Sequence, residues 1–167
     1  MIRSAQDGDL PLFAWTLGLP QRTLLEVVKY CFPELGPLKL MPGKQYKAIL
    51  QSVPAEHGEL VAMLFANRSP HESMQHADWL AHCIAAAAMG SRHLWQDMGL
   101  GERAAVSALL QRYFEPLYRR NTGEIKWKRF LFAELASLLG KEALQPPGCA
   151  QCPQFPVCFP LSGSERT

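Results

Sequence analysis

The sequence has few charged side chains, no long apolar run and no export signal. Charged residues make up 19% of its 167 residues and the formal net charge is +2, a balance that does not indicate nucleic acid as a partner. The longest apolar stretch, around Ile84 to Met89, is far below the roughly 18 residues of a membrane span. Asp7 and Asp9 lie where the apolar part of a signal peptide would begin. We therefore expect a cytoplasmic protein that binds neither membranes nor nucleic acid.

A disulfide framework is not expected either, because the five cysteines are odd in number and no export signal accompanies them. Cys31 and Cys83 fall on apolar helix faces, where a free thiol behaves as a small hydrophobic side chain. The other three, Cys149, Cys152 and Cys158, lie within ten residues of one another in a proline-rich segment. That density indicates that these three thiols act together.

The apolar residues recur at helical spacing, and no segment alternates with a period of two for long enough to form a strand. We predict an all-α fold, a compact helical bundle over residues 1–142, followed by a Pro/Cys-rich metal-binding tail over residues 143–167. The expected helices cover residues 20–32, 44–51, 56–67, 70–89, 102–114 and 124–139, the fourth with Ser69 as its cap. The side chains expected to be buried together are Trp79, Leu109, Phe114, Trp127, Phe130 and Leu135.

The three clustered cysteines have the spacing C-x2-C-x5-C. Two thiolates separated by two residues can bind one metal centre, because the turn between them brings both sulfurs to the same side. Prolines 146, 147, 153 and 156 restrict the unfolded chain, so forming such a loop costs less entropy. The pattern predicts a metal or cluster site at Cys149, Cys152 and Cys158, and zinc remains open because sites with three cysteines and one histidine are common.

No catalytic constellation is found, and we expect a protein that is not an enzyme. The segment from His93 to Asp97 lies between two expected helices, where its polar side chains either serve a function or cap a helix end. Residues 99–104 fit G-x-G-x-x-A, but no strand precedes them, so a dinucleotide site is rejected.

Residues 101–130 form the one basic region, with seven Lys or Arg side chains against three Glu. Such a run is either a solvated helix face or a docking surface for an acidic protein or an oxyanion such as molybdate. The residues singled out for the second reading are Arg119, Arg120, Lys126 and Lys128.

Three segments in this order carry a resemblance to a known family. They are HLWQDMGL at 93–100, RRNTGEIKWKRF at 119–130 and the cysteine motif ending in Cys158-Phe159. Together they resemble the NifQ family, strongly from about Trp79 to Phe159 and only thinly before Glu59. The resemblance implies an iron–sulfur protein that carries molybdenum in a Mo–Fe–S cluster. It also implies delivery of that molybdenum to the proteins that assemble the nitrogenase iron–molybdenum cofactor.

The resemblance also implies one departure, because the family motif is C-x4-C-x2-C-x5-C and its first cysteine falls on Leu144 here. Three thiolates are the natural complement of three irons, so a three-iron or Mo–Fe–S cluster would fit Cys149, Cys152 and Cys158. The open corner would permit exchange of molybdenum, and His93 is the candidate for a substitute fourth ligand. The alternative is a helical interaction protein whose tail holds structural zinc or a degenerate cluster site.

Overall fold

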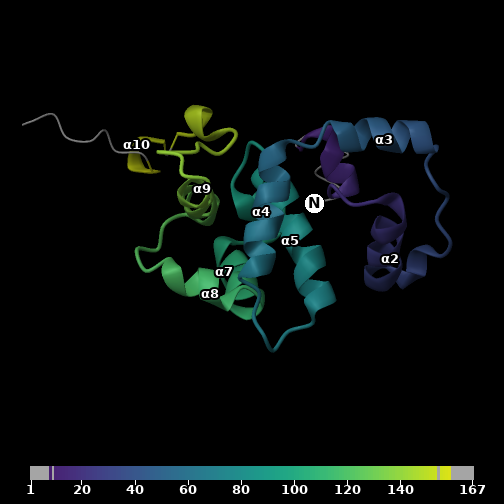
Figure 1. The fold of residues 1–167 in the computed structure, drawn as a ribbon, viewed down its shortest axis with the longest axis horizontal. Helices are drawn as coiled ribbons and strands as arrows, with labels where there is room; N and C mark the ends of the chain where they lie inside the picture. Colours follow the sequence, from purple (N-terminus) through teal and green to yellow (C-terminus); the bar gives the residue numbers. More distant parts are fainter. Residues whose placement is uncertain (1–7, 9, 154, 159–167) are drawn as a thin grey trace, which may run out of the picture.

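The structure, a computed structural model, describes residues 8, 10–153 and 155–158 and is built from helices (Figure 1). No strand occurs in these ranges, which confirms the predicted fold class. None of the described helices is long and apolar enough to cross a bilayer. The elements in chain order are η1 (Leu12–Thr16), α2 (Gln21–Cys31), η2 (Pro33–Leu35), α3 (Gly43–Gln51), α4 (Ala55–Ala66), α5 (Met74–Ala88), α6 (Leu94–Asp97), α7 (Arg103–Tyr113), α8 (Glu115–Arg120), α9 (Trp127–Leu138), η3 (Cys149–Gln151) and α10 (Phe155–Cys158).

The centre of the molecule is the helix pair α4 and α5, which lie side by side (Figure 1). Their close approach follows from the run of alanines 85–88 in α5, which has no exposed surface. Helices α2 and α3 lie on one side of this pair, and α9 and α10 lie on the other (Figure 1). The cysteine motif and α2 are therefore on opposite sides of the molecule.

The core is close to the predicted one. Trp79, Phe114, Trp127, Phe130 and Leu135 are buried in one hydrophobic cluster. Leu109, however, is only half-buried. Two neighbours on the same helix, Val106 and Leu110, are buried in the core instead.

Two helices begin later than predicted. Ser69 does not cap α5; its side chain accepts a hydrogen bond from the Glu115 backbone N–H at 3.0 Å, and Ser73 caps α5 instead. Helix α9 begins at Trp127 because Glu124 adopts a left-handed backbone (φ +48°). The side chain of Asn121 closes that turn through two 2.9 Å hydrogen bonds with the backbone of Ile125.

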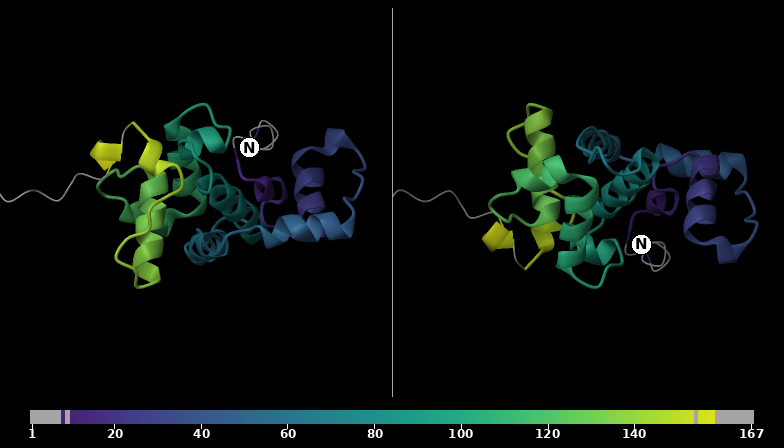
Figure 2. Two further views of the ribbon diagram at one scale, coloured as in Figure 1. Left: turned by 90° about the horizontal axis from the view of Figure 1, so that it is seen from above. Right: turned by 90° about the horizontal axis from the view of Figure 1, so that it is seen from below.

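The segment after α9 returns to the bundle. Leu144 packs against the hydrophobic core and Pro146 is buried. Farther along, η3 and α10 lie beside α9 (Figures 1 and 2). Residues 159–167, the end of the predicted tail, lie outside the described residues.

Candidate metal-cluster site

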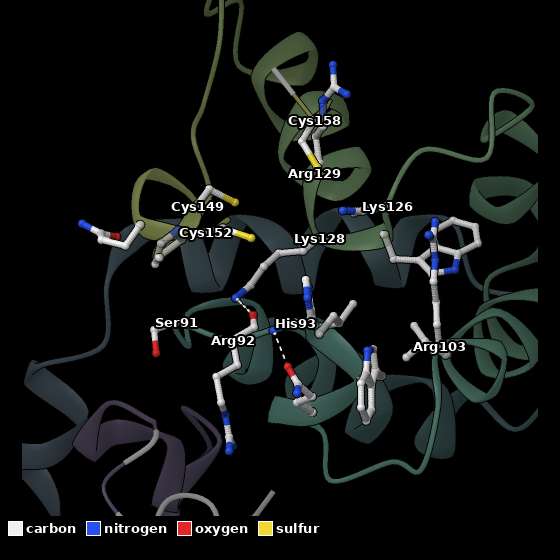
Figure 3. Close-up of a pocket in the computed structure, with 18 of the residues that line it drawn as sticks. Ser91, Arg92, His93, Arg103, Lys126, Lys128, Arg129, Cys149, Cys152 and Cys158 are labelled. Atoms are coloured by element: carbon white, nitrogen blue, oxygen red, sulfur yellow. Dashed lines mark hydrogen bonds between the residues drawn. The ribbon is translucent and has the colours of Figure 1, made fainter. Parts of the chain in front are cut away.

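A cavity of about 930 Å³ lies between the start of α9, the loop before α6 and the C-terminal motif (Figure 3). Residues far apart in sequence meet there, because α9 packs beside both of the other segments. The cavity is lined by Ser91, Arg92, His93, Leu94, Trp95, Gln96, Arg103, Val106, Lys126, Trp127, Lys128, Arg129, Pro147, Gly148, Cys149, Gln151, Cys152, Pro153 and Cys158.

All three cysteines of the motif line this cavity, as does His93. Cys149 begins η3, Cys152 follows it and Cys158 ends α10, and each is half-buried. In Figure 3 the sulfurs of Cys149 and Cys152 point into the cavity from one side, and Cys158 is drawn near Arg129. The structure thus brings together the thiols that the sequence singled out.

The two remaining cysteines lie elsewhere. Cys83 is half-buried against the core, as predicted, and burial raises the pKa of its thiol to about 11. Cys31 is exposed at the end of α2, so its predicted place on a buried apolar face is wrong. Neither lines the cavity.

A tight turn positions the first two thiols. Backbone hydrogen bonds join Cys149 N to Pro146 O at 3.3 Å and Cys152 N to Cys149 O at 3.0 Å. Gly148 precedes this turn with φ +75°, and a Cβ there would overlap the backbone of Ser91. Glycine is therefore needed both for the left-handed backbone and for the close approach of the motif to Ser91.

The donors do not converge on a single metal ion in the described part of the chain. Among the described residues, no three His, Cys, Asp or Glu side chains lie close enough to hold one metal ion. A zinc ion binds sulfur at about 2.3 Å, so its ligands must converge on one point.

The lining is strongly cationic. Five lining residues carry a guanidinium or ammonium group, and no Asp or Glu is among the lining residues of the described chain. These five residues are Arg92, Arg103, Lys126, Lys128 and Arg129. A cavity of this kind favours an anion, and thiolate-bound iron–sulfur clusters are anionic.

Lys128 is the structural centre of one wall. Its ammonium donates hydrogen bonds to the carbonyl oxygens of Gly90 at 2.7 Å and Arg92 at 2.8 Å. Asp97, which is fully buried, lies 3.5 Å from the Lys128 ammonium and accepts from Arg92 Nε at 3.0 Å. Burial lowers the pKa of Lys128, and the Asp97 carboxylate acts against that shift. These contacts fix α9 to the loop before α6.

His93 lies directly before α6, and its backbone N–H donates to the side chain of Gln96 at 3.2 Å. Burial lowers the pKa of His93, and the charges of Lys126 and Lys128 lower it further. These effects favour the neutral imidazole, which is the form that binds metals.

The basic residues predicted as partner or oxyanion contacts separate into two groups. Lys126 and Lys128 line the cavity, but Arg119 and Arg120 do not. On α8, Arg119 pairs with Glu115 at 2.6 Å and Arg120 with Glu134 at 2.8 Å. Lys128 is buried, so the interpretation of the basic region as a solvated helix face does not hold for this residue.

Sequence reasoning missed part of the site. Ser91 and Arg92 come directly before the first recognised motif, and Asp97 was left as either a cap or a functional residue. Arg103 and Arg129 were counted in the basic region without being assigned to the site. Leu144 lies in a different cavity, with Phe13 and Met89.

Comparisons with known proteins agree with the three segments. The family model described as NifQ matches residues 1–160, so the likeness extends through the N-terminal half that the sequence motifs left thin. Protein NifQ of Azotobacter vinelandii is 32% identical over 167 residues, with 95% of this chain and 84% of that protein covered. Protein NifQ of Klebsiella pneumoniae is 33% identical over 86 residues, covering 51% of this chain and 52% of that protein. No solved structure matches the chain.

Proposed function

This chain belongs to the NifQ family, and on that premise we propose that it carries molybdenum for assembly of the nitrogenase iron–molybdenum cofactor. Family membership supports a role in nitrogen fixation as an accessory protein of cofactor biosynthesis. The proposal adds the mode of action: the molybdenum travels as cargo in an iron–sulfur cluster, of a three-iron or Mo–Fe–S type, and is handed to cofactor-assembly proteins in the cytoplasm.

The observation that carries the proposal is the meeting of three thiols in one cavity whose lining includes five Arg and Lys residues. Cys149, Cys152 and Cys158 supply the soft thiolate ligands that iron in such clusters requires. Lys128 and its neighbours offset the negative charge of these thiolates and of a bound cluster. Its positive charge already acts in that direction, because it opposes the rise that burial causes in the pKa of the Cys149 thiol.

The family motif has a fourth cysteine, but this chain has Leu144 at that position, and Leu144 lines a separate cavity. One metal corner would therefore meet His93 or a ligand from outside the protein. An exchangeable ligand at that corner suits a carrier, which must release its molybdenum to another protein.

Structural zinc is the second candidate function, because three cysteines and His93 line the same cavity and this combination of residue types is common in zinc sites. Zinc binding would require the four side chains to move together onto one point. Colour separates the two. An iron–sulfur protein prepared without oxygen is brown, whereas a zinc protein is colourless.

The test is anaerobic reconstitution with iron and sulfide, followed by analysis of iron and acid-labile sulfide. We expect each single variant to lose most of the bound iron and sulfide, because alanine cannot replace the charge donation of a thiolate. The variants are Cys149→Ala, Cys152→Ala and Cys158→Ala. Cys31→Ala and Cys83→Ala are the matched controls and should retain both. Equal retention by all five variants would contradict the proposed ligands.

A further inference from the structure

A cluster of apolar side chains is exposed on the side of the molecule opposite the cysteine motif. It covers the end of α2, η2 and the loop over residues 36–42, which leads to α3 along the outer edge of the molecule (Figure 1). Each side chain of the cluster is between 37% and 63% exposed. We call this cluster the N-terminal apolar surface, and it consists of Tyr30, Phe32, Leu35, Leu38, Leu40 and Met41.

Clustering separates this surface from ordinary exposed apolar residues. Single exposed apolar side chains are normal in soluble proteins, whereas a group of them in one place is typical of an interaction site. Residues 29–45 are all exposed, without one buried or half-buried position among them. Packing within the chain therefore does not account for six large apolar side chains in this stretch.

The N-terminal apolar surface is nevertheless held in place by the rest of the molecule. At the end of α2, the Tyr30 ring contacts the rings of His76 and Trp79 on α5, with centroids 5.0 and 5.4 Å apart. The loop before α3 returns to the start of α2, where Gln21 Nε2 donates to the Met41 carbonyl oxygen at 3.2 Å. The exposed side chains are thus presented by a frame that is fixed at both ends.

Helix α2, η2 and the loop that follows them together line a cavity of about 470 Å³. Its lining residues are Leu25, Lys29, Pro33, Gly36, Pro37 and Leu38. A mostly apolar hollow of this kind can receive an apolar side chain of another protein, which is the usual anchor of a protein interface. A lipid bilayer has no fixed side chain that would fill the hollow, so this feature favours a protein over a membrane as the partner.

The surroundings of the N-terminal apolar surface are basic. Residues 20–47 carry five Lys or Arg side chains against two Glu, whereas the net charge of the whole chain is only +2. The five basic residues are Arg22, Lys29, Lys39, Lys44 and Lys47, and all of them are exposed. None of them takes part in an ion pair within the described part of the chain. Exposed cations around an apolar centre attract a partner of opposite charge, and they oppose pairing with a second copy of the same surface.

We propose that the N-terminal apolar surface docks a partner protein that presents acidic side chains around an apolar anchor. The anchor enters the cavity beside Leu38, and carboxylates of the partner pair with Lys29 and Lys39. Because the surface and the cysteine motif lie on opposite sides of the molecule (Figure 1), docking leaves the cavity of the cysteines open for loading or release of cargo. The inference does not depend on the proposed function, since no cysteine of the motif takes part in the docking.

Photo-cross-linking in nitrogen-fixing cells identifies what the surface contacts. The full-length variant Leu40→p-benzoylphenylalanine carries the cross-linker, and Leu138→p-benzoylphenylalanine is the matched control, because Leu40 and Leu138 are 63% and 66% exposed. Mass spectrometry should find a protein that is linked at position 40 and not at position 138, through a segment in which Asp and Glu outnumber Lys and Arg. The absence of a cross-link specific to position 40, a link to a segment without acidic excess, or a link to a second copy of this chain would overturn the proposal.

Titrations with the purified cross-linked protein then test the chemistry of the contact. Lys39→Glu should weaken its binding about tenfold at low salt and less at high salt, because charge reversal replaces attraction by repulsion and salt screens both. Leu40→Asp should weaken binding about tenfold at either salt concentration, because it removes an apolar contact. Lys141→Glu and Leu138→Asp make the same changes at exposed positions elsewhere and should leave the affinity unchanged. Equal losses in the variants and in their controls would overturn the proposal.

Sedimentation with phosphatidylglycerol vesicles tests the membrane as the alternative partner. Binding of the wild type to these vesicles that is lost in Lys39→Glu, without binding to the cross-linked protein, would show a membrane surface and overturn the proposal.

The triple variant Cys149→Ser, Cys152→Ser, Cys158→Ser separates docking from cargo binding. It should bind the cross-linked protein as tightly as the wild type, and a loss of binding would place the contact at the cavity and overturn the proposal. If docking is confirmed while the wild type takes up no iron and sulfide, the docking surface stands and the carrier proposal is wrong. If the wild type takes up both and no protein docks, the carrier proposal stands and the docking surface is wrong.

Discussion

Lys128 shows how one residue can be misjudged from its neighbours in sequence. It stands among Lys126, Arg129 and other basic residues, which is typical of a solvated helix face, yet only 7% of it is exposed. Its ammonium is held by two backbone carbonyls and by Asp97. A buried charge of this kind is tolerated only because it is paired and hydrogen-bonded. Charge reversal at Lys128 would therefore report on folding rather than on partner binding.

Lys128→Met should lower the free energy of unfolding by about 3 kcal/mol, the low end of the cost of breaking a buried pair, because Arg92 still pairs with Asp97 while two backbone carbonyls lose their donor. Urea denaturation measures the loss. Lys141→Met, which removes an exposed lysine, should change stability by less than about 0.5 kcal/mol. A loss that is equally small at Lys128 would contradict the account of the cavity wall.

His57 is a second residue whose properties depend on its packing. It is buried against Phe13 and lies so close to Gly18 that a Cβ there would overlap the imidazole ring. Burial and the nearby His82 lower the pKa of His57 to about 4, against an ordinary value of 6.5. The unfolded chain therefore takes up a proton below pH 6.5 that the folded chain resists until about pH 4.

Acidification should consequently destabilise the fold through His57 as the pH falls from about 6.5 to 4. The lowered pKa of His57 corresponds to a loss of about 3 kcal/mol in the free energy of unfolding. The measurement is urea denaturation at pH 7 and pH 4.5. His57→Leu should lose less stability between the two pH values than the wild type, whereas His71→Leu, at an exposed position, should behave like the wild type. An identical pH response in all three proteins would refute the assignment.

At the scale of elements, the left-handed turns decide where the site segments lie. Gly148 and Gly140 both have positive φ, +75° and +63°, but only Gly148 approaches another backbone, that of Ser91. The difference matters because Gly148 comes directly before Cys149. The turn that begins at Gly148 and carries Cys149 and Cys152 therefore packs against Ser91, in the same loop whose carbonyl oxygens accept hydrogen bonds from Lys128.

Gly148→Ala should lower retention of iron and sulfide after reconstitution, because the added methyl group displaces the turn from Ser91. Gly140→Ala is the matched control, since it bears a similar backbone strain of about 1–2 kcal/mol but meets nothing within 4 Å. It should keep the metal content of the wild type. Circular dichroism should show the same helix content in both variants, and equal metal loss in both would attribute the effect to strain alone.

At the scale of the whole molecule, the sequence predicted the helices well where apolar periodicity was long, as over 103–113 and 55–66. Local signals failed where a distant partner competed for the same group: Ser69 looks like a helix cap but accepts from Glu115 instead. The site shows the same division. The cysteines were found because their spacing is local. Arg92 joins them through the hydrogen bonds of Lys128 on α9 to the loop before α6, and Arg103 through the position of α7, and no short motif encodes either.

The central claim is that one cationic cavity with three thiols holds the molybdenum cargo in a cluster. The most direct test is anaerobic reconstitution of the wild-type protein with iron, sulfide and molybdate, followed by desalting and elemental analysis of the protein fraction. The account predicts a brown protein that retains iron, acid-labile sulfide and molybdenum together, and that loses all three when Cys149, Cys152 or Cys158 is replaced. A colourless protein that retains neither iron nor sulfide, or that retains zinc in their place, would contradict it.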